Sequence, residues 1–148
     1  MQNAIEAIKT RLSAKAATLG IQTIKVGYVQ DLASGVTDYD ALLVIPPKEV
    51  ISKPYAWQSS VFDIKLYVIR LDEGANGEMS ETERIEAWDE LRTICKQLIM
   101  DLCGDPSNMR LADSPVTLNP DSGGADGLLP DRVVWIDATL RLEVNVCD

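Results

Sequence analysis

The feature that most constrains the fold is a strict alternation of apolar and polar residues within residues 132–147. The apolar set is Ile136, Ala138, Leu140, Leu142, Val144 and Val146, and the polar set between them is Asp137, Thr139, Arg141, Glu143 and Asn145. Because successive side chains of a β-strand point to opposite faces, this pattern predicts a long strand. One of its faces should lie in the core, and the other should face water or a partner.

Two other segments repeat their apolar residues at helical spacing. The first is Asn3–Leu19, and Gly20 is expected to end it in a left-handed cap. The second begins at Ser80, with Glu83 at the capping-box position, and Gly104 is expected to end it. The predicted core stripes are Ile5, Ile8, Leu12, Ala16 and Leu19 in the first helix, and Ile85, Trp88, Leu91, Cys95, Leu98 and Leu102 in the second.

The remaining predicted strands are Ile24–Val29, Ala41–Ile45, Val61–Leu71 and Met109–Leu118, the last interrupted by Pro115. Pro46 and Pro47 are expected to stop the second of these, because proline has no amide to donate to a neighbouring strand. Two helices are too few to cover both faces of a sheet. The 148 residues are therefore expected to form one α+β domain. Its single, mainly antiparallel sheet of about five strands should carry both helices on one face, in the order α-β-β-β-α-β-β.

The charge of the chain argues against nucleic-acid binding. Its net charge is −9, from 14 basic and 23 acidic residues, and the nearest approach to a basic cluster is Lys9, Arg11 and Lys15. Proteins that bind nucleic acid need clustered Lys or Arg to displace counterions. An acidic wall, in contrast, would let nucleic acid pass without trapping it.

Sequence patterns also bear on the compartment. The longest apolar run, Ala41–Pro47, is too short to span a membrane, and residues 1–6 lack the pattern of a signal peptide. We therefore expect synthesis in the cytoplasm and no membrane partner. Cys95, Cys103 and Cys147 match neither a zinc pattern nor a disulfide framework, and this fits core positions in a reducing compartment.

Catalytic signals are scarce. The chain has no histidine, and this removes Ser-His-Asp and Cys-His nucleophiles and the usual zinc sites. We predict no catalytic, cofactor-binding or metal-ligating residue. Acidic residues do cluster along the second helix, at Glu78, Glu81, Glu83, Glu86, Asp89 and Glu90. They are expected to form a solvated face, and a small carboxylate-dependent enzyme is the alternative.

Two loops carry more apolar residues than loops usually do. The loop over residues 48–59 contains Pro54, Tyr55 and Trp57, and the tip over residues 119–130 contains Leu128 and Leu129. Tyr and Trp are favoured interface anchors because they bury a large area at a low cost in entropy. The alternatives are that the first loop folds back on its own core and that the tip is disordered.

The order of the predicted helices and strands is a further feature of the sequence. An amphipathic first helix is followed by short strands, the middle one being Asp40-Ala-Leu-Leu-Val-Ile-Pro-Pro, then by a long strand, an acidic-capped helix and a terminal hairpin with an extended tip. This arrangement resembles the tail-terminator and tail-completion (head–tail joining) proteins of long-tailed bacteriophages. The resemblance covers nearly the whole chain and rests on size, order and acidity.

The resemblance implies a structural virion protein that binds copies of itself in a hexameric ring. Such a ring sits on the tail-tube protein, stops tube polymerisation and offers a surface to the head–tail connector protein in the neck. DNA would pass through its lumen without specific binding, and no cofactor is implied. The apolar loops would then supply contact patches. The alternatives are another neck, baseplate or capsid-accessory role.

Overall fold

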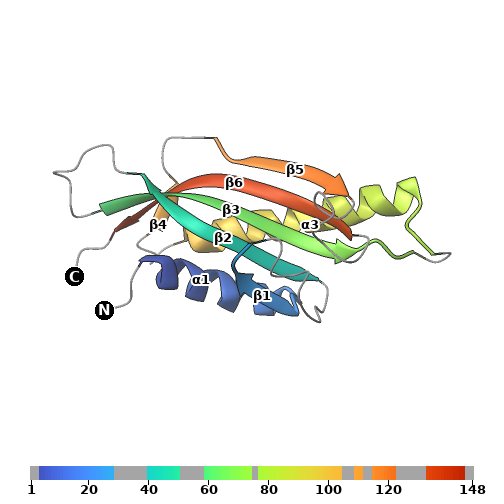
Figure 1. The fold of residues 1–148 in the computed structure, drawn as a ribbon, viewed down its shortest axis with the longest axis horizontal. Coiled ribbons are helices and arrows are strands. Elements are labelled where there is room, and N and C mark those ends of the chain that lie inside the picture. Colours follow the sequence, from blue (N-terminus) through green and yellow to red (C-terminus); the bar gives the residue numbers. More distant parts are fainter. Residues whose placement is uncertain are drawn as a thin grey trace.

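The computed structural model describes residues 4–28, 40–50, 59–74, 77–104, 109–111, 115–122 and 133–145. These residues contain two helices and one six-stranded sheet (Figure 1). The helices are α1 (Ala4–Thr18) and α3 (Glu81–Leu102), and the strands are β1 (Thr23–Val26), β2 (Ala41–Val50), β3 (Ser59–Leu71), β4 (Met109–Leu111), β5 (Thr117–Ser122) and β6 (Val133–Asn145). The expected α+β class is confirmed.

The strand with the alternating pattern lies in the middle of the sheet. The order is β1-β2-β3-β6, and the far side of β6 is shared by β5, along Val134–Thr139, and β4, along Leu142–Val144. Strand β6 also pairs with β3 over the full length of both strands. Every pairing is antiparallel except β1 with β2, which is parallel. The sheet is thus mixed rather than purely antiparallel.

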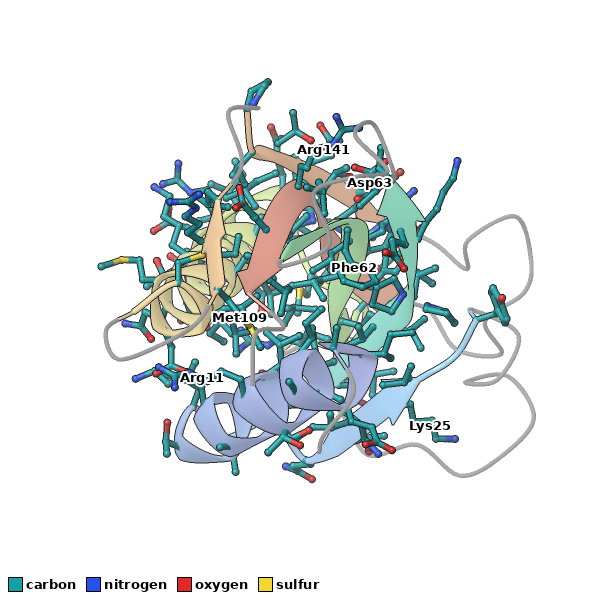
Figure 2. All side chains as sticks on the ribbon, turned by 90° about the vertical axis from the view of Figure 1, so that its left-hand side faces the viewer. Arg11, Lys25, Phe62, Asp63, Met109 and Arg141 are labelled. Carbon is teal, nitrogen blue, oxygen red and sulfur yellow. The ribbon has the colours of Figure 1, made fainter. Side chains whose placement is uncertain are left out.

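Both helices cover the same face of this sheet, as predicted. Helix α1 packs on β1 and β2, helix α3 packs on β3 and β6, and the helices contact each other. The apolar side chains of β6 that point to this face are all buried: Val134, Ile136, Ala138, Leu140, Leu142 and Val144. Phe62 and Met109 belong to the same core (Figure 2). The alternation therefore predicted the core face of the central strand correctly for the five of these residues from Ile136 to Val144.

Helix α1 ends as its sequence predicts. Gly20 has a φ of +83°, and the Ile21 N–H donates to the Ala16 carbonyl oxygen over 3.1 Å. A side chain at Gly20 would be strained in this left-handed conformation, so the glycine permits the chain to turn back toward β1. Ile8, Leu12 and Ala16 are buried, but the prediction was wrong for Ile5, which is 41% exposed. The predicted cap residue Asn3 lies outside the described residues.

Helix α3 begins with the predicted capping box. The Glu83 N–H donates to Ser80 Oγ over 3.2 Å, and the Ser80 N–H donates to Glu83 Oε1 over 3.1 Å. Its buried residues are Ala87, Leu91, Cys95, Leu98, Ile99 and Leu102. The prediction was wrong for Ile85, which is 56% exposed. At 3.6 residues per turn, Ile85 lies about 120° around the helix from Leu91, and Ala87 takes its place in the core.

The predicted stop at Pro46 and Pro47 was also wrong, because β2 continues to Val50. The pairing with β3 shifts between Ile45 and Lys48, so a bulge holds the two prolines. Among the described residues, β1 pairs with β2 only as far as Val44. The prolines therefore lie where β2 is an edge strand on that side, and there a missing amide is tolerated.

The predicted strand over residues 109–118 is divided into β4 and β5. The two strands follow the same side of β6, but their pairing registers differ by three residues. The chain therefore leaves the edge of β6 and rejoins it. Strand β5 also takes in residues 119–122, which the sequence had suggested were the start of a flexible tip.

Candidate functional site

The residues predicted to form interfaces lie outside the described part of the chain. Pro54, Tyr55 and Trp57 fall between β2 and β3, and Leu128 and Leu129 fall between β5 and β6. Their role as contacts stays a prediction. The described residues nevertheless form two surfaces that can be examined for function.

The first surface is a groove between the first three turns of α3 and strand β5. Its volume is about 390 Å³, and its lining residues are Ile85, Glu86, Trp88, Asp89, Arg92, Leu118, Pro120 and Ile136. The Trp88 Nε1–H donates to the Asp121 carbonyl oxygen over 2.9 Å, and this bond fixes the helix to the edge strand. Apolar side chains form most of the wall, while carboxylates and one guanidinium lie among them.

Sequence reasoning missed this groove because it assigned Ile85 and Trp88 to the core. In the fold Trp88 is only partly buried, and Ile85 is mostly exposed. The available signal was the helical angle, because Ile85 lies about 120° around the helix from Leu91. The partner wall, Leu118 and Pro120 of β5, could not be assigned without the pairing of β5 with β6.

The second surface is the flank of α1 that points away from α3. On the opposite flank, Arg11 Nε and Nη2 donate to the Asp101 carbonyl oxygen over 3.2 and 3.1 Å, and they tie α1 to the end of α3. Figure 2 shows Arg11 on the side of α1 toward α3 and Lys25 at the outer edge beside β1. Ile5 and Lys9 are exposed and one helical turn apart. A hollow of about 420 Å³ is lined by Glu6, Lys9, Thr10 and Ser13.

A buried ion pair fixes the start of α3 and with it the groove. The Asp72 side chain is only 4% exposed and accepts from the Met79 N–H over 2.9 Å and from Arg84 Nη2 over 2.7 Å. The preceding turn is closed by the Gly74 N–H, which donates to the Gly77 carbonyl oxygen over 2.6 Å.

A second polar contact joins the sheet to the middle of the same helix. Arg70 Nε and Nη2 donate to the two Asp40 carboxylate oxygens over 2.9 and 2.8 Å, and Arg70 Nη1 donates to Glu90. Hydrogen bonding to Asp40, and then to Glu90, raises the pKa of Arg70. A bidentate pair of this kind fixes the relative orientation of the two side chains and adds a charge-assisted interaction between them. We assign it to holding β2, β3 and α3 in place.

The face of the sheet away from the helices carries a row of cross-strand ion pairs. Arg141 Nε lies 2.8 Å from Asp63 Oδ1, and both side chains lie on the face away from α1 (Figure 2). Lys65 lies 3.6 Å from Asp137, and Arg110 lies 2.8 Å from Glu143. The hydrogen bond from Arg141 lowers the pKa of Asp63. The polar set of the alternating strand is thus largely charge-balanced within the sheet.

At the other end of this face the side chains form a small second core. Leu43, Ile69, Val133 and Trp135 are buried together, and Tyr67 and Ile45 pack beside them. The rings of Tyr67 and Trp135 meet edge to face, with centroids 6.4 Å apart. The open face is therefore divided into an apolar end and a charged end.

The acidic residues of α3 have structural partners or face solvent. Glu83 caps the helix, Asp89 accepts from Arg92 over 2.8 Å, and Glu90 bonds to Arg70. Within the described residues, no three His, Cys, Asp or Glu side chains gather in a way that could hold a metal ion. In the same residues, no helix has the length and apolar character needed to cross a membrane. Burial raises the pKa of the Cys95 thiol to about 12, which makes its thiolate scarce.

The sequence matches no protein-family model and none of the curated proteins with which it was compared.

Proposed function

We propose that this protein is a structural subunit that joins copies of itself into a ring at the end of a bacteriophage tail tube. The ring would end tube polymerisation and join the tail to the head and neck. The observation that carries the proposal is that the described sheet has two unlike open edges, β1 on one side and β4 with β5 on the other. Contacts between unlike surfaces join subunits head to tail, and they close into a ring when the rotation permits.

The distribution of polar groups supports an assembly role. Several of the described ion pairs join strand to strand, helix to strand or helix to helix, and such pairs stabilise the arrangement of the elements. The groove between α3 and β5 is open and apolar rather than a closed cleft with opposed acids. Grooves of this kind commonly hold a protein segment. With a net charge of −9, a ring of such subunits would repel the phosphates of DNA that passes through it.

The direct test is the effect of the purified chain on tail-tube subunits as they polymerise. Electron microscopy should show short tubes with one end capped, and their mean length should fall as more chain is added. Tubes of unchanged length, with no added density at either end, would contradict the proposal.

The predicted loop contacts can be tested in the same assay with Trp57→Ala. Truncation of an interface anchor costs roughly 2–4 kcal/mol of association free energy, so capping should weaken while the isolated subunit keeps its melting temperature. Met100→Ala is the matched control, because Met100 is 72% exposed on the last turns of α3. A melting temperature that falls as much as capping does would place Trp57 in the core instead.

A further inference from the structure

We propose that the groove between α3 and β5 receives the outer flank of α1 from a second copy of this chain. This inference rests on the proposed ring function, and it names the two surfaces that would meet at each subunit boundary. All residues named for the two surfaces lie in the described part of the chain.

The groove has the shape and composition of a receiving site. Ile85 is 56% exposed, and it lies beside Trp88 and Leu118 in the wall of a groove of about 390 Å³. A single exposed apolar residue needs no explanation, but several around one concave surface indicate a binding site. The hydrogen bond from Trp88 to the Asp121 carbonyl oxygen holds the two walls at a fixed separation.

The flank of α1 has the complementary shape. Ile5 is 41% exposed, and Lys9 follows one turn later on the same side. The hollow beside Lys9, Thr10 and Ser13 has a volume of about 420 Å³. Ile5 can thus enter the groove while Ile85 enters the hollow, as ridges enter grooves where helices pack.

The two surfaces lie on opposite sides of the helical layer. Helix α1 lies over β1 and β2 and uses Arg11 on its inner flank to bind the end of α3, so the flank with Ile5 faces outward on the β1 side. Helix α3 covers β3 and β6 and opens its groove on the β5 side. A neighbour placed side by side therefore brings its α1 flank to this groove, and the contact repeats around a ring.

The charged residues of the two surfaces also differ. The hollow on the α1 flank is lined by one basic residue, Lys9, and one acidic residue, Glu6, whereas the groove is lined by two acidic residues, Glu86 and Asp89, and one basic residue, Arg92. The head-to-tail contact brings Lys9 to Glu86, and opposite charge of this kind favours correct encounter and register.

The test uses two variants that each remove one half of the contact. Ile5→Asp changes only the α1 flank, and Ile85→Asp changes only the groove. Met100→Asp introduces the same charge at an exposed position away from the groove and serves as the control. The mass of each purified protein is measured by sedimentation equilibrium, and far-UV circular dichroism verifies its fold.

Each single variant should associate at least about tenfold more weakly than the wild type, and Met100→Asp should assemble normally. An equimolar mixture of Ile5→Asp and Ile85→Asp should form dimers and nothing larger, because every such dimer has one intact contact and two damaged surfaces. Lys9→Glu and Glu86→Lys should each weaken assembly, and the double variant should recover it.

Three outcomes would overturn the inference. If the wild type forms rings that survive Ile85→Asp, the contact lies elsewhere, although the ring proposal stands. If the mixture of the two Asp variants stays monomeric, the two surfaces do not bind each other. A wild type that stays monomeric with or without tail tubes would overturn both this contact and the proposed function.

Discussion

Replacing Arg84 alone is expected to destabilise the protein more than replacing Arg84 and Asp72 together. In the wild type, Arg84 Nη2 lies 2.7 Å from Asp72 Oδ2, and the Asp72 side chain is only 4% exposed. Arg84→Met would leave a buried carboxylate without its guanidinium partner. Loss of one member of a buried pair costs about 3–5 kcal/mol, because the other charge stays desolvated.

The expected magnitude is somewhat smaller here. Because the Arg84 side chain is 28% exposed, water can partly replace it, and we expect a loss of about 2–3 kcal/mol. In Asp72→Asn/Arg84→Met the buried group is neutral, and its amide oxygen can still accept from the Met79 N–H. That double variant should lose only about 1 kcal/mol, as for a weakened hydrogen bond.

Urea unfolding and thermal melting of dilute protein measure these differences. In a protein of this size each kcal/mol corresponds to about 2–4 °C in melting temperature. Arg92→Met is the matched control, because Arg92 and Asp89 are 52% and 66% exposed and their pair should contribute about 0–1 kcal/mol. A cost for Arg84→Met no larger than that for Arg92→Met, or a double variant as unstable as Arg84→Met, would show that Asp72 is not a buried charge that depends on Arg84.

Three further predictions concern other parts of the fold. Because Arg141 lowers the pKa of Asp63 in the folded state, this pair stabilises the protein above the ordinary carboxyl pKa and loses its effect as pH falls through the lowered value. Both side chains are more than a third exposed, so Asp63→Asn should lower the free energy of unfolding in urea by at most about 1 kcal/mol at neutral pH. In strong acid it should have no effect, and a loss of stability that persists in acid would contradict this assignment. Trp88→Phe removes the hydrogen bond to the Asp121 carbonyl oxygen, so amide hydrogen exchange in β5 should accelerate while exchange in β2 stays unchanged. An equal change in both strands would show that this bond does not act locally on β5. Cys95, with a pKa raised to about 12, should resist alkylation at neutral pH until urea unfolds the chain, and rapid labelling of the native protein, detected by mass spectrometry, would show that the site is not buried.

The parts of the fold that the sequence predicted depend on local patterns. The alternation along β6, the Ser80–Glu83 capping box and the left-handed Gly20 each involve residues close together in the chain. Such patterns determine which way a side chain points or where a helix ends. These patterns also gave only two helices, which are too few to cover both faces of a sheet. The placement of both helices on one face was therefore predicted correctly.

The parts that the sequence missed depend on neighbours distant in the chain. Pro46 and Pro47 continue β2 because β1 ends beside Val44, and nothing in the local sequence reveals where that neighbour stops. The parallel pairing of β1 with β2 is set in the same way by tertiary packing. Ile85 was placed in the core because its spacing allowed it, but β5 pairs with β6 at a position that leaves Ile85 at an open groove.

We propose that the protein acts by closing into a ring of identical subunits. Native mass spectrometry of the purified chain, alone and bound to tail-tube protein, measures whether the ring closes. We expect one discrete oligomer, a hexamer, whose mass does not change as concentration rises. A monomer at every concentration, or an open ladder of sizes that keeps growing, would contradict it.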